Sequence, residues 1–250
     1  MSRSFTERAA SLAKRANSRI VLAFDPEFNP YKLKLFEERS KRRREIQVQV
    51  RGLLSELEGM IAGIKLGLPA MLALGPDELE KLVDNFKAKY FFICDLKLAD
   101  IGYVNRLVAE QIFELGFDAL IIHAFIGTKQ GVDEVVELAG EMGRGVLAVC
   151  AMTHKGANEH LNKYFGKLTA LAISAGVDGF ILPATFPRLI TKTRKKYPRM
   201  LIFSPGVGAQ GAPFGSAIKA GADFEIIGRA IYTAPAPTQK VRESKEAMGR

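Results

Sequence analysis

Cysteine and histidine are scarce in this sequence and tryptophan is absent: its 250 residues include two cysteines and three histidines. Two thiols cannot build a disulfide framework or a zinc knuckle, and Cys94 and Cys150 lie in apolar, strand-like runs, so we expect both to be reduced core residues. His123, His154 and His160 lack the spacing of a zinc site, and no acidic cluster offers a cage for a divalent ion. We therefore expect no metal site. His123, at a strand end, is expected to be a hydrogen-bonded orienting residue rather than a base.

Long apolar runs are also missing, and none reaches the length of a membrane-spanning helix. The chain starts with "MSRSFTERAASLAKRANSR", which is polar and helix-like and does not resemble a secretory signal. A content of 48% hydrophobic and 25% charged residues is that of an ordinary globular protein. We expect a soluble protein of the cytoplasm with no membrane partner.

Acidic residues are fewer than basic ones, 27 against 36, which gives a formal net charge of +9. Such an excess can serve nucleic-acid binding, but it is more often a solvated surface that also attracts small anionic substrates. The stretch "EERSKRRREI" (37–46) is interpreted in the same way, as a solvated basic face. We expect no nucleic-acid partner.

Apolar runs of strand length recur along the chain and are separated by helical stretches. They are nearly continuous in Val, Ile, Leu and Phe, as is typical of parallel strands that are covered on both faces. Eight such runs are present: "RIVLAFD" (19–25), "AGIKLG" (62–67), "YFFICDLK" (90–97), "ALIIHAF" (119–125), "GVLAVCAM" (145–152), "GFILPA" (179–184), "MLIFSPGV" (200–207) and "FEIIGRA" (224–230). Eight β-α units in a chain of this length predict an α/β fold of the (β/α)8 TIM-barrel type, with a doubly wound open sheet as the alternative.

Two of the intervening stretches carry clear helical signals. The stretch 75–86 opens with Pro76 and acidic residues, as a helix N-terminus should. Apolar residues between 46 and 57 recur on one helical face: Ile46, Val50, Leu53, Leu54 and Leu57. We expect residues 1–250 to form a single barrel domain, with a basic helical extension at about 27–60 between the first two strands.

Four charged residues occupy the ends of the first three predicted strands. Asp25, Lys65, Asp95 and Lys97 would meet at the C-terminal mouth of a barrel, where barrel enzymes carry their chemistry. Strand alternation places Asp95 and Lys97 on one face. A salt bridge that only closes the strand end is the alternative, but buried ion pairs contribute little net stability, which favours a functional site. Asp100 lies beyond the strand and is equally well explained as the N-cap of the next helix.

The second signal is the glycine-rich stretch "SPGVGAQG" (204–211). Its G-x-G-x-x-G match to a dinucleotide fingerprint is weak because it follows the seventh strand instead of opening an early βαβ unit. In barrels, the loops after strands seven and eight are the usual phosphate site. Gly206 and Gly208 would let the backbone approach a phosphate, Arg229 would bind it through its guanidinium fork, and Gln210 would add a donor.

Taken together, these motifs resemble those of the orotidine 5'-monophosphate decarboxylases of microbial type. The resemblance covers about residues 19 to 232, and it rests on Asp25, Lys65, the element Asp95-x-Lys97-x-x-Asp100-Ile101, Thr153-His154, "SPGVGAQG" and "IIGRAIY". It implies a (β/α)8 barrel, a homodimer, and cofactor-free loss of CO2 from orotidine monophosphate to give UMP.

The resemblance also implies roles for individual residues. Lys97 would protonate C6, Asp95 would lie against the substrate carboxylate, and Lys65 would bridge the acidic residues and touch the ribose. Asp100 would reach into the neighbouring site of the dimer, and Asp25 would hold a ribose hydroxyl. The other substrate-binding residues implied are Ile101, Thr153, Pro205, Gly206, Gly208, Gln210, Gly211, Gly228 and Arg229.

Three features depart from that family. Val104 stands where the family often has Thr, which removes one hydroxyl contact to the ribose of the partner site. Thr153 replaces a more usual Ser and keeps the hydroxyl. The interval from Asp25 to Lys65 is longer than expected, and the sequence assigns no role to its basic helix.

Two rival functions remain open at this point. Related sugar-phosphate decarboxylases and aldolases share D-x-K-x-x-D but hold Mg²⁺ partly through an acidic residue at the end of strand two, where this chain has Lys65, which would repel the ion. A non-catalytic barrel that binds nucleotides or RNA would leave the Asp–Lys array without a purpose.

Overall fold

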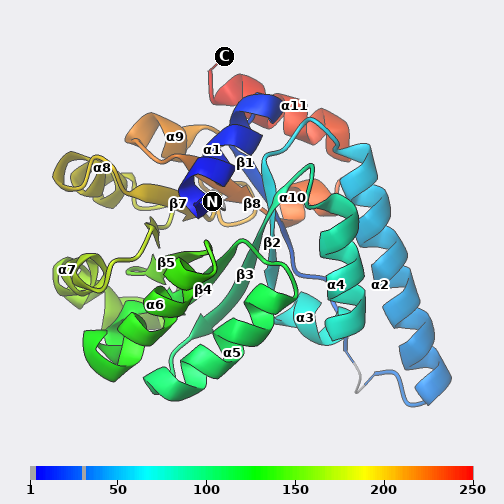
Figure 1. Ribbon diagram of the computed structural model, residues 1–250. Coiled ribbons are helices and arrows are strands. Elements are labelled where there is room, and N and C mark those ends of the chain that lie inside the picture. Colours follow the sequence, from blue (N-terminus) through cyan, green and yellow to red (C-terminus); the bar gives the residue numbers. More distant parts are fainter. Residues whose placement is uncertain (1–3, 30–31, 250) are drawn as a thin grey trace.

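The computed structural model describes residues 4–29 and 32–249, and the ends of the predicted domain (1–3 and 250) and positions 30–31 of the predicted extension lie outside the described residues. Eight parallel strands form a closed barrel in the order β1 to β8, with β8 paired to β1 (Figure 1). The strands are β1 (Ile20–Phe24), β2 (Gly63–Gly67), β3 (Phe91–Leu98), β4 (Ala119–His123), β5 (Gly145–Val149), β6 (Gly179–Ile181), β7 (Leu201–Pro205) and β8 (Phe224–Ile227). The predicted (β/α)8 barrel and its eight strands are confirmed.

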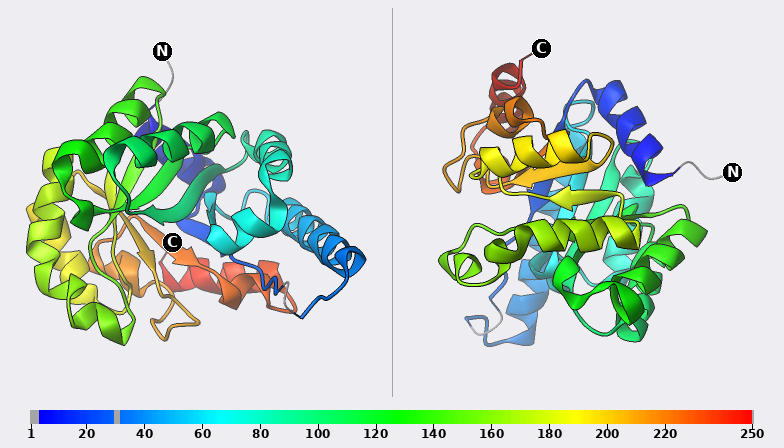
Figure 2. Two further views of the ribbon diagram at one scale, coloured as in Figure 1. Left: turned by 90° about the horizontal axis from the view of Figure 1, so that it is seen from below. Right: turned by 90° about the vertical axis from the view of Figure 1, so that its left-hand side faces the viewer.

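Helices cover the outer side of the barrel, and the first of them lies across its N-terminal end (Figures 1 and 2). They are α1 (Phe5–Ala16), α2 (Phe36–Glu56), α3 (Leu68–Leu74), α4 (Pro76–Phe86), α5 (Gly102–Glu114), α6 (Asp133–Glu141), α7 (Phe165–Ala175), α8 (Pro187–Lys196), α9 (Ser216–Ala220), α10 (Arg229–Tyr232) and α11 (Pro237–Ala247). Short helical turns complete the connections: η1 (Ala124–Ile126), η2 (Thr128–Val132), η3 (Lys155–Asn158) and η4 (Leu161–Tyr164). No helix of residues 4–29 and 32–249 is both long and apolar enough to cross a membrane.

Both helical predictions are confirmed. Pro76 begins α4, with Asp77 and Glu78 in its first turn, where the helix dipole favours negative charge. The apolar face predicted between 46 and 57 is buried against the barrel. These buried residues all lie in the second half of α2 or just beyond it, so the first half makes no comparable contact with the core.

The core has two layers because alternate strand residues face opposite sides of the barrel wall. On β1, Ile20 and Leu22 pack outward against the helices, whereas Val21 and Ala23 point into the barrel. Cys94 and Cys150 are free thiols buried in the outer layer, as predicted, and burial raises the pKa of both.

Helix α1 closes the N-terminal end of the barrel. Phe5 is buried against the barrel rings, with ring centroids 6.0 Å from Phe91 and 6.2 Å from Phe203. Gly145 leaves the space for this ring, because a Cβ there would collide with Phe5. Since α1 fills this end, the opening to solvent is at the C-terminal ends of the strands.

Candidate active site

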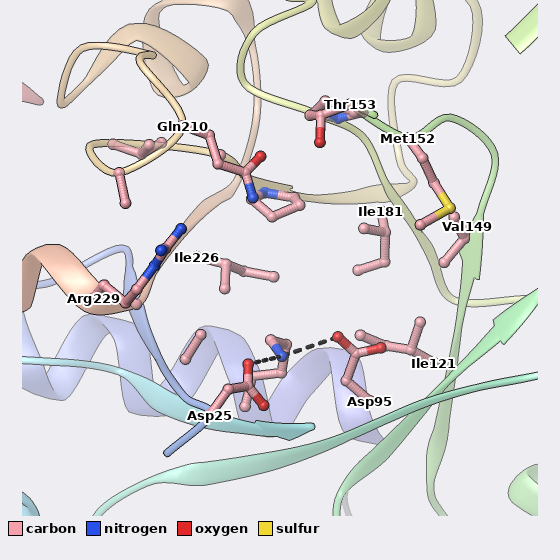
Figure 3. Close-up of a pocket in the computed structure, with 18 of the residues that line it drawn as sticks. Asp25, Asp95, Ile121, Val149, Met152, Thr153, Ile181, Gln210, Ile226 and Arg229 are labelled. Carbon is pink, nitrogen blue, oxygen red and sulfur yellow. Dashed lines mark hydrogen bonds and ion pairs between the residues drawn. The ribbon is translucent and has the colours of Figure 1, made fainter. Parts of the chain in front are cut away.

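A cavity of about 410 Å³ lies at the C-terminal ends of the strands (Figure 3). Ten of the predicted site residues line it: Asp25, Lys65, Asp95, Lys97, Thr153, Pro205, Gly206, Gln210, Gly228 and Arg229. Asp100, Ile101, Gly208 and Gly211 do not line it. The strand-end argument thus brings predicted residues from six of the eight strands (β1, β2, β3, β5, β7 and β8) to one cavity.

A chain of ion pairs forms one wall of this cavity. The Lys65 ammonium lies 3.2 Å from Oδ2 of Asp25 and 2.9 Å from Oδ2 of Asp95, and the Lys97 ammonium lies 2.7 Å from Oδ1 of Asp95. Lys65 and Asp95 are 8% and 9% exposed, whereas Lys97 and Asp25 are 36% and 37% exposed. The inner pair is therefore buried, and the outer cation and carboxylate face the opening.

The buried pair stays charged despite its burial. Burial alone would raise the pKa of Asp95, but the charges of Lys65 and Lys97 outweigh it and lower the pKa. Burial alone would lower the pKa of Lys65, but the charges of Asp95 and Asp25 outweigh it and raise the pKa. Lys97 is thus held beside a carboxylate that remains ionised.

The end of β3 gives Lys97 its position. Pairing with β4 shifts register between Cys94 and Leu98, and Lys97 has a left-handed backbone with φ of 50°. Both Asp95 and Lys97 line the cavity, as strand alternation predicts, although they lie within the part of β3 where the register shifts. A non-glycine residue at positive φ is costly, and such strain is concentrated at functional sites.

Asp25 is held from three sides. Its Oδ1 accepts a hydrogen bond from the Gly67 N–H at 2.9 Å, its Oδ2 faces Lys65, and its backbone carbonyl accepts one from the Tyr232 hydroxyl at 3.0 Å. Gly67 is required here because a Cβ at this position would collide with Oδ1 of Asp25. Sequence reasoning missed both Gly67 and Tyr232, because neither contact leaves a pattern in the sequence.

The glycine-rich loop after β7 follows the predicted phosphate-site geometry only in part. Gly206, Gly208 and Gly211 all have positive φ, at 100°, 74° and 95°. Gly206 lines the cavity, but Gly208 packs against Ala230, where an added Cβ would come within 2.9 Å. The second and third glycines therefore shape the loop, and Gln210 and Arg229 present their side chains to the cavity (Figure 3).

The opposite side of the cavity is apolar. Ile121, Val149, Met152 and Ile181 line it, and Ile121 lies beside Asp95 in Figure 3. These residues were not predicted as site residues, although the signal exists: three of them are inward positions on strands β4, β5 and β6. A polar wall thus faces a water-excluding one.

Asp100 and Ile101 lie outside this cavity, on the connection from β3 to α5. The N-cap interpretation of Asp100 is wrong, because the N-cap residue of α5 is Ile101 and makes no side-chain cap bond. The Asp100 carboxylate instead accepts a hydrogen bond from the Ile101 N–H at 2.7 Å, while Asn105 bonds to the Asp100 backbone. Ile101 is 65% exposed, and Val104 is half-buried.

His123 lies at the end of β4, next to the irregular end of β3. Its Nδ1 is buried without a hydrogen-bond partner among the described residues, so the expected hydrogen-bonded orienting role is not supported at that atom. The ring lies 4.7 Å from that of Phe125. Burial and the nearby Lys97 lower the pKa of His123, which keeps the ring neutral at physiological pH.

The chain is similar to known proteins both in sequence and in structure. The model of the "Orotidine 5'-phosphate decarboxylase / HUMPS family" matches residues 19–244. An orotidine 5'-phosphate decarboxylase of Aeropyrum pernix is 43% identical over 74% of this chain and 75% of its own, and one of Methanosarcina mazei is 39% identical over 75% and 84%. The crystal structure of the orotidine 5'-monophosphate decarboxylase from Sulfolobus solfataricus has a TM-score of 0.77 at 30% identity, covering 92% of this chain and 97% of that one.

Proposed function

The chain belongs to the orotidine 5'-phosphate decarboxylase / HUMPS family, and we propose that its cavity is where orotidine 5'-monophosphate (OMP) loses CO2, with Lys97 as the proton donor. The chain is a carboxy-lyase of pyrimidine biosynthesis that converts OMP to UMP. The observation that carries the site assignment is the ammonium of Lys97, which faces the opening while Asp95 holds it at 2.7 Å.

The reaction needs a cation where negative charge develops. When the bond between C6 and the carboxylate breaks, its electron pair stays on C6 and CO2 leaves. Lys97 stabilises this carbanion electrostatically and then transfers one N–H proton to C6, which gives UMP and a neutral amine that is reprotonated from solvent. Because the buried Lys65 and Asp95 fix its position, little reorganisation is required at that moment.

The rest of the cavity orients the substrate. Gln210, Arg229 and the backbone at Gly206 would bind the phosphate, and Pro205 and Gly228 flank that end. Asp25 and Lys65 would contact the ribose, and Thr153 the pyrimidine edge. The substrate carboxylate would then lie between Asp95 and the apolar wall, where exclusion of water favours release of neutral CO2. Phosphate binding far from C6 supplies binding energy for this alignment.

One residue of this chain argues against the alternative function, a Mg²⁺-dependent reaction on sugar phosphates. Lys65 is the central residue of β2, and its ammonium already contacts both Asp25 and Asp95. A divalent ion at those carboxylates would have to displace or approach a buried cation. We therefore propose that the reaction uses no cofactor.

We also propose that two copies of the chain form a homodimer in which Asp100 and Ile101 complete the neighbouring cavity. Large apolar side chains are exposed at the start of α5 and after β4: Ile101, Tyr103, Leu107 and Phe125, at 65%, 65%, 41% and 53%. Isolated exposed apolar residues are common, but several on α5 next to a carboxylate that lies outside the cavity favour an interface. The pairing would bury these side chains and bring the Asp100 carboxylate to a second site.

We propose that residues 1–250 act as one domain in the cytoplasm, with a small-molecule substrate and neither nucleic acid nor a membrane as partner. The buried thiols of Cys94 and Cys150 suit a reducing compartment.

Absorbance spectroscopy tests the proposed reaction. The ultraviolet spectrum of OMP changes as it becomes UMP, so turnover is followed with the purified protein in excess EDTA. We expect undiminished turnover with EDTA and none on sugar phosphates with Mg²⁺. Turnover that needs Mg²⁺ would refute the cofactor-free proposal, and a folded protein without OMP turnover would refute the site assignment.

A further inference from the structure

The first half of α2 is the part of the fold that the reaction leaves unexplained. None of its residues from Phe36 to Glu45 is buried, and Figures 1 and 2 show the helix at the periphery of the molecule. It carries five basic residues: Arg39, Lys41, Arg42, Arg43 and Arg44. Only Arg42 among these is half-buried.

Three of these arginines contact the connection between β1 and α2, whose described residues (25–29 and 32–35) belong to no helix or strand. Arg42 donates a hydrogen bond to the Glu27 carbonyl at 3.2 Å, and the Arg43 guanidinium lies over the Phe28 ring, 5.4 Å from its centroid. Arg39 donates to the Leu33 carbonyl at 2.9 Å. Glu27 and Leu33 lie outside any helix or strand, so the guanidinium groups of Arg42 and Arg39 give their carbonyls hydrogen-bond partners that no sheet or helix supplies.

This segment begins at the cavity. Glu27 and Phe28 follow Asp25 by two and three residues, and Phe28 packs on the core. The side chain and carbonyl of Asp25 are already fixed by Lys65, Gly67 and Tyr232. The contacts of Arg42 and Arg43 hold the chain two and three residues beyond Asp25, at a point that those three bonds do not reach.

We propose that Arg42 and Arg43 are positioning residues for Asp25, so that the basic half of α2 holds the end of β1 in the geometry that binds the substrate ribose. The inference rests on the proposed function, since it takes Asp25 as the ribose ligand. A carboxylate must be held within a fraction of an ångström to bind a ribose hydroxyl well. The helix α2 would hold the backbone next to Asp25 from outside the barrel.

Two neighbours on the same helix provide matched controls. Lys41 and Arg44 carry the same charge and are exposed, and the side chain of neither makes a hydrogen bond or ion pair with any residue of 4–29 and 32–249. If the helix acted only by attracting the anionic substrate, all these cations would matter alike, and added salt would erase the effect. If it acts through the contacts next to Asp25, loss of Arg42 or Arg43 lowers activity, and loss of Lys41 or Arg44 does not.

The test is a double-mutant cycle on kcat/KM for OMP, with Arg42→Ala and Asp25→Ala singly and together. We expect Arg42→Ala to lower kcat/KM about tenfold in the wild-type background, mostly through KM, and to change it less than about twofold once Asp25 is absent. Lys41→Ala and Arg44→Ala should stay within about twofold of wild type. Equal factors in both backgrounds, or an equal loss in Arg44→Ala that disappears at high salt, would overturn the proposal.

Hydrogen exchange without substrate separates this proposal from the proposed function. Arg42→Ala should accelerate amide exchange between residues 25 and 29, whereas Arg44→Ala should not. Unchanged exchange there would overturn the positioning role even in an active enzyme. Absence of OMP turnover by the wild type would instead refute the proposed function and leave the exchange result standing.

Discussion

Asp95 contacts two cations, the buried Lys65 and the half-exposed Lys97. Its substitution tests how much the buried ion pair contributes to the stability of the fold. Asp95→Asn leaves Lys65 buried with Asp25 alone, and breaking a buried pair in this way should destabilise the fold by about 3 kcal/mol at pH 7. Chemical denaturation of both proteins measures this difference. Asp84→Asn, which breaks the exposed pair with Lys87, is the control and should change stability by less than about 0.5 kcal/mol.

The pH dependence of that difference follows from the direction of the shift. The pKa of Asp95 is lowered in the folded protein from the ordinary value of 3.8, so its stabilising contribution is complete above 3.8 and is lost as pH falls through the lower folded pKa. The difference in unfolding free energy between wild type and Asp95→Asn should therefore be constant from pH 8 to 5 and become smaller only below pH 3.8. A gap that narrows already between pH 7 and 5 would show that the pKa of Asp95 is raised instead.

Arg229 is the residue whose loss should depend on the phosphate. Arg229→Ala removes charge-assisted hydrogen bonds and should lower kcat/KM for OMP by about 100-fold. The nucleoside orotidine, which has no phosphate, is the internal control, and its kcat/KM should be the same in both enzymes. An equal loss with orotidine would mean that Arg229 acts on the base or the ribose.

At the scale of elements, sequence patterns predicted the strands and most of the cavity. Apolar runs locate β1 to β8 because both faces of a parallel strand are buried, and the strand ends then bring Asp25, Lys65 and Asp95 together. The patterns could not predict the left-handed turn at Lys97 or the N-cap of α5, which depend on tertiary contacts. Gly208 was expected at the phosphate because a glycine motif specifies flexibility and not the direction that the loop takes.

At the same scale, helix α1 closes the N-terminal end of the barrel, and we expect its packing to affect stability but not catalysis. Phe5→Ala should destabilise the fold by about 4 kcal/mol and lower Tm by about 10 °C, because it leaves a cavity among Phe91, Phe203 and Gly145. Phe36→Ala, where the ring is 81% exposed, should change stability by less than about 0.5 kcal/mol. Calorimetry of the three proteins measures both effects.

Catalysis should not follow stability in these variants. Phe5 lies at the closed end of the barrel and the cavity at the open end, so kcat/KM of the folded Phe5→Ala enzyme should match wild type. A decrease in kcat/KM of more than about tenfold, measured well below Tm, would show that the packing of α1 affects the cavity.

At the scale of the whole molecule, the proposed homodimer would place Asp100 in the neighbouring site. If Asp100 serves the neighbouring site, then Lys97→Ala and Asp100→Asn are each nearly inactive, but a mixed dimer has one complete site. An equal mixture that exchanges subunits should recover about a quarter of wild-type specific activity, since half of the dimers are mixed and each has one good site of two. No recovery, despite proven exchange, would place Asp100 in its own subunit's site or outside catalysis.

The net charge of +9 is also a property of the whole molecule. The sequence alone could not show which of the basic side chains are solvated and which bind other parts of the chain. Some of the cations are solvated, such as Arg44, and some hold backbone segments, such as Arg39 and Arg42. Composition counts both equally, because it contains no information on which side chain a carbonyl lies beside.

The central claim is that the ammonium of Lys97 protonates the C6 carbanion, and turnover by Lys97→Ala tests it most directly. We expect kcat for OMP to fall by at least about 10⁴-fold with EDTA present, while UMP still binds with an affinity within about tenfold of wild type, because the phosphate and ribose contacts remain. Intact UMP binding with lost turnover would support the claim. A variant that retains more than about a tenth of wild-type kcat would contradict it and move the proton donor to another group.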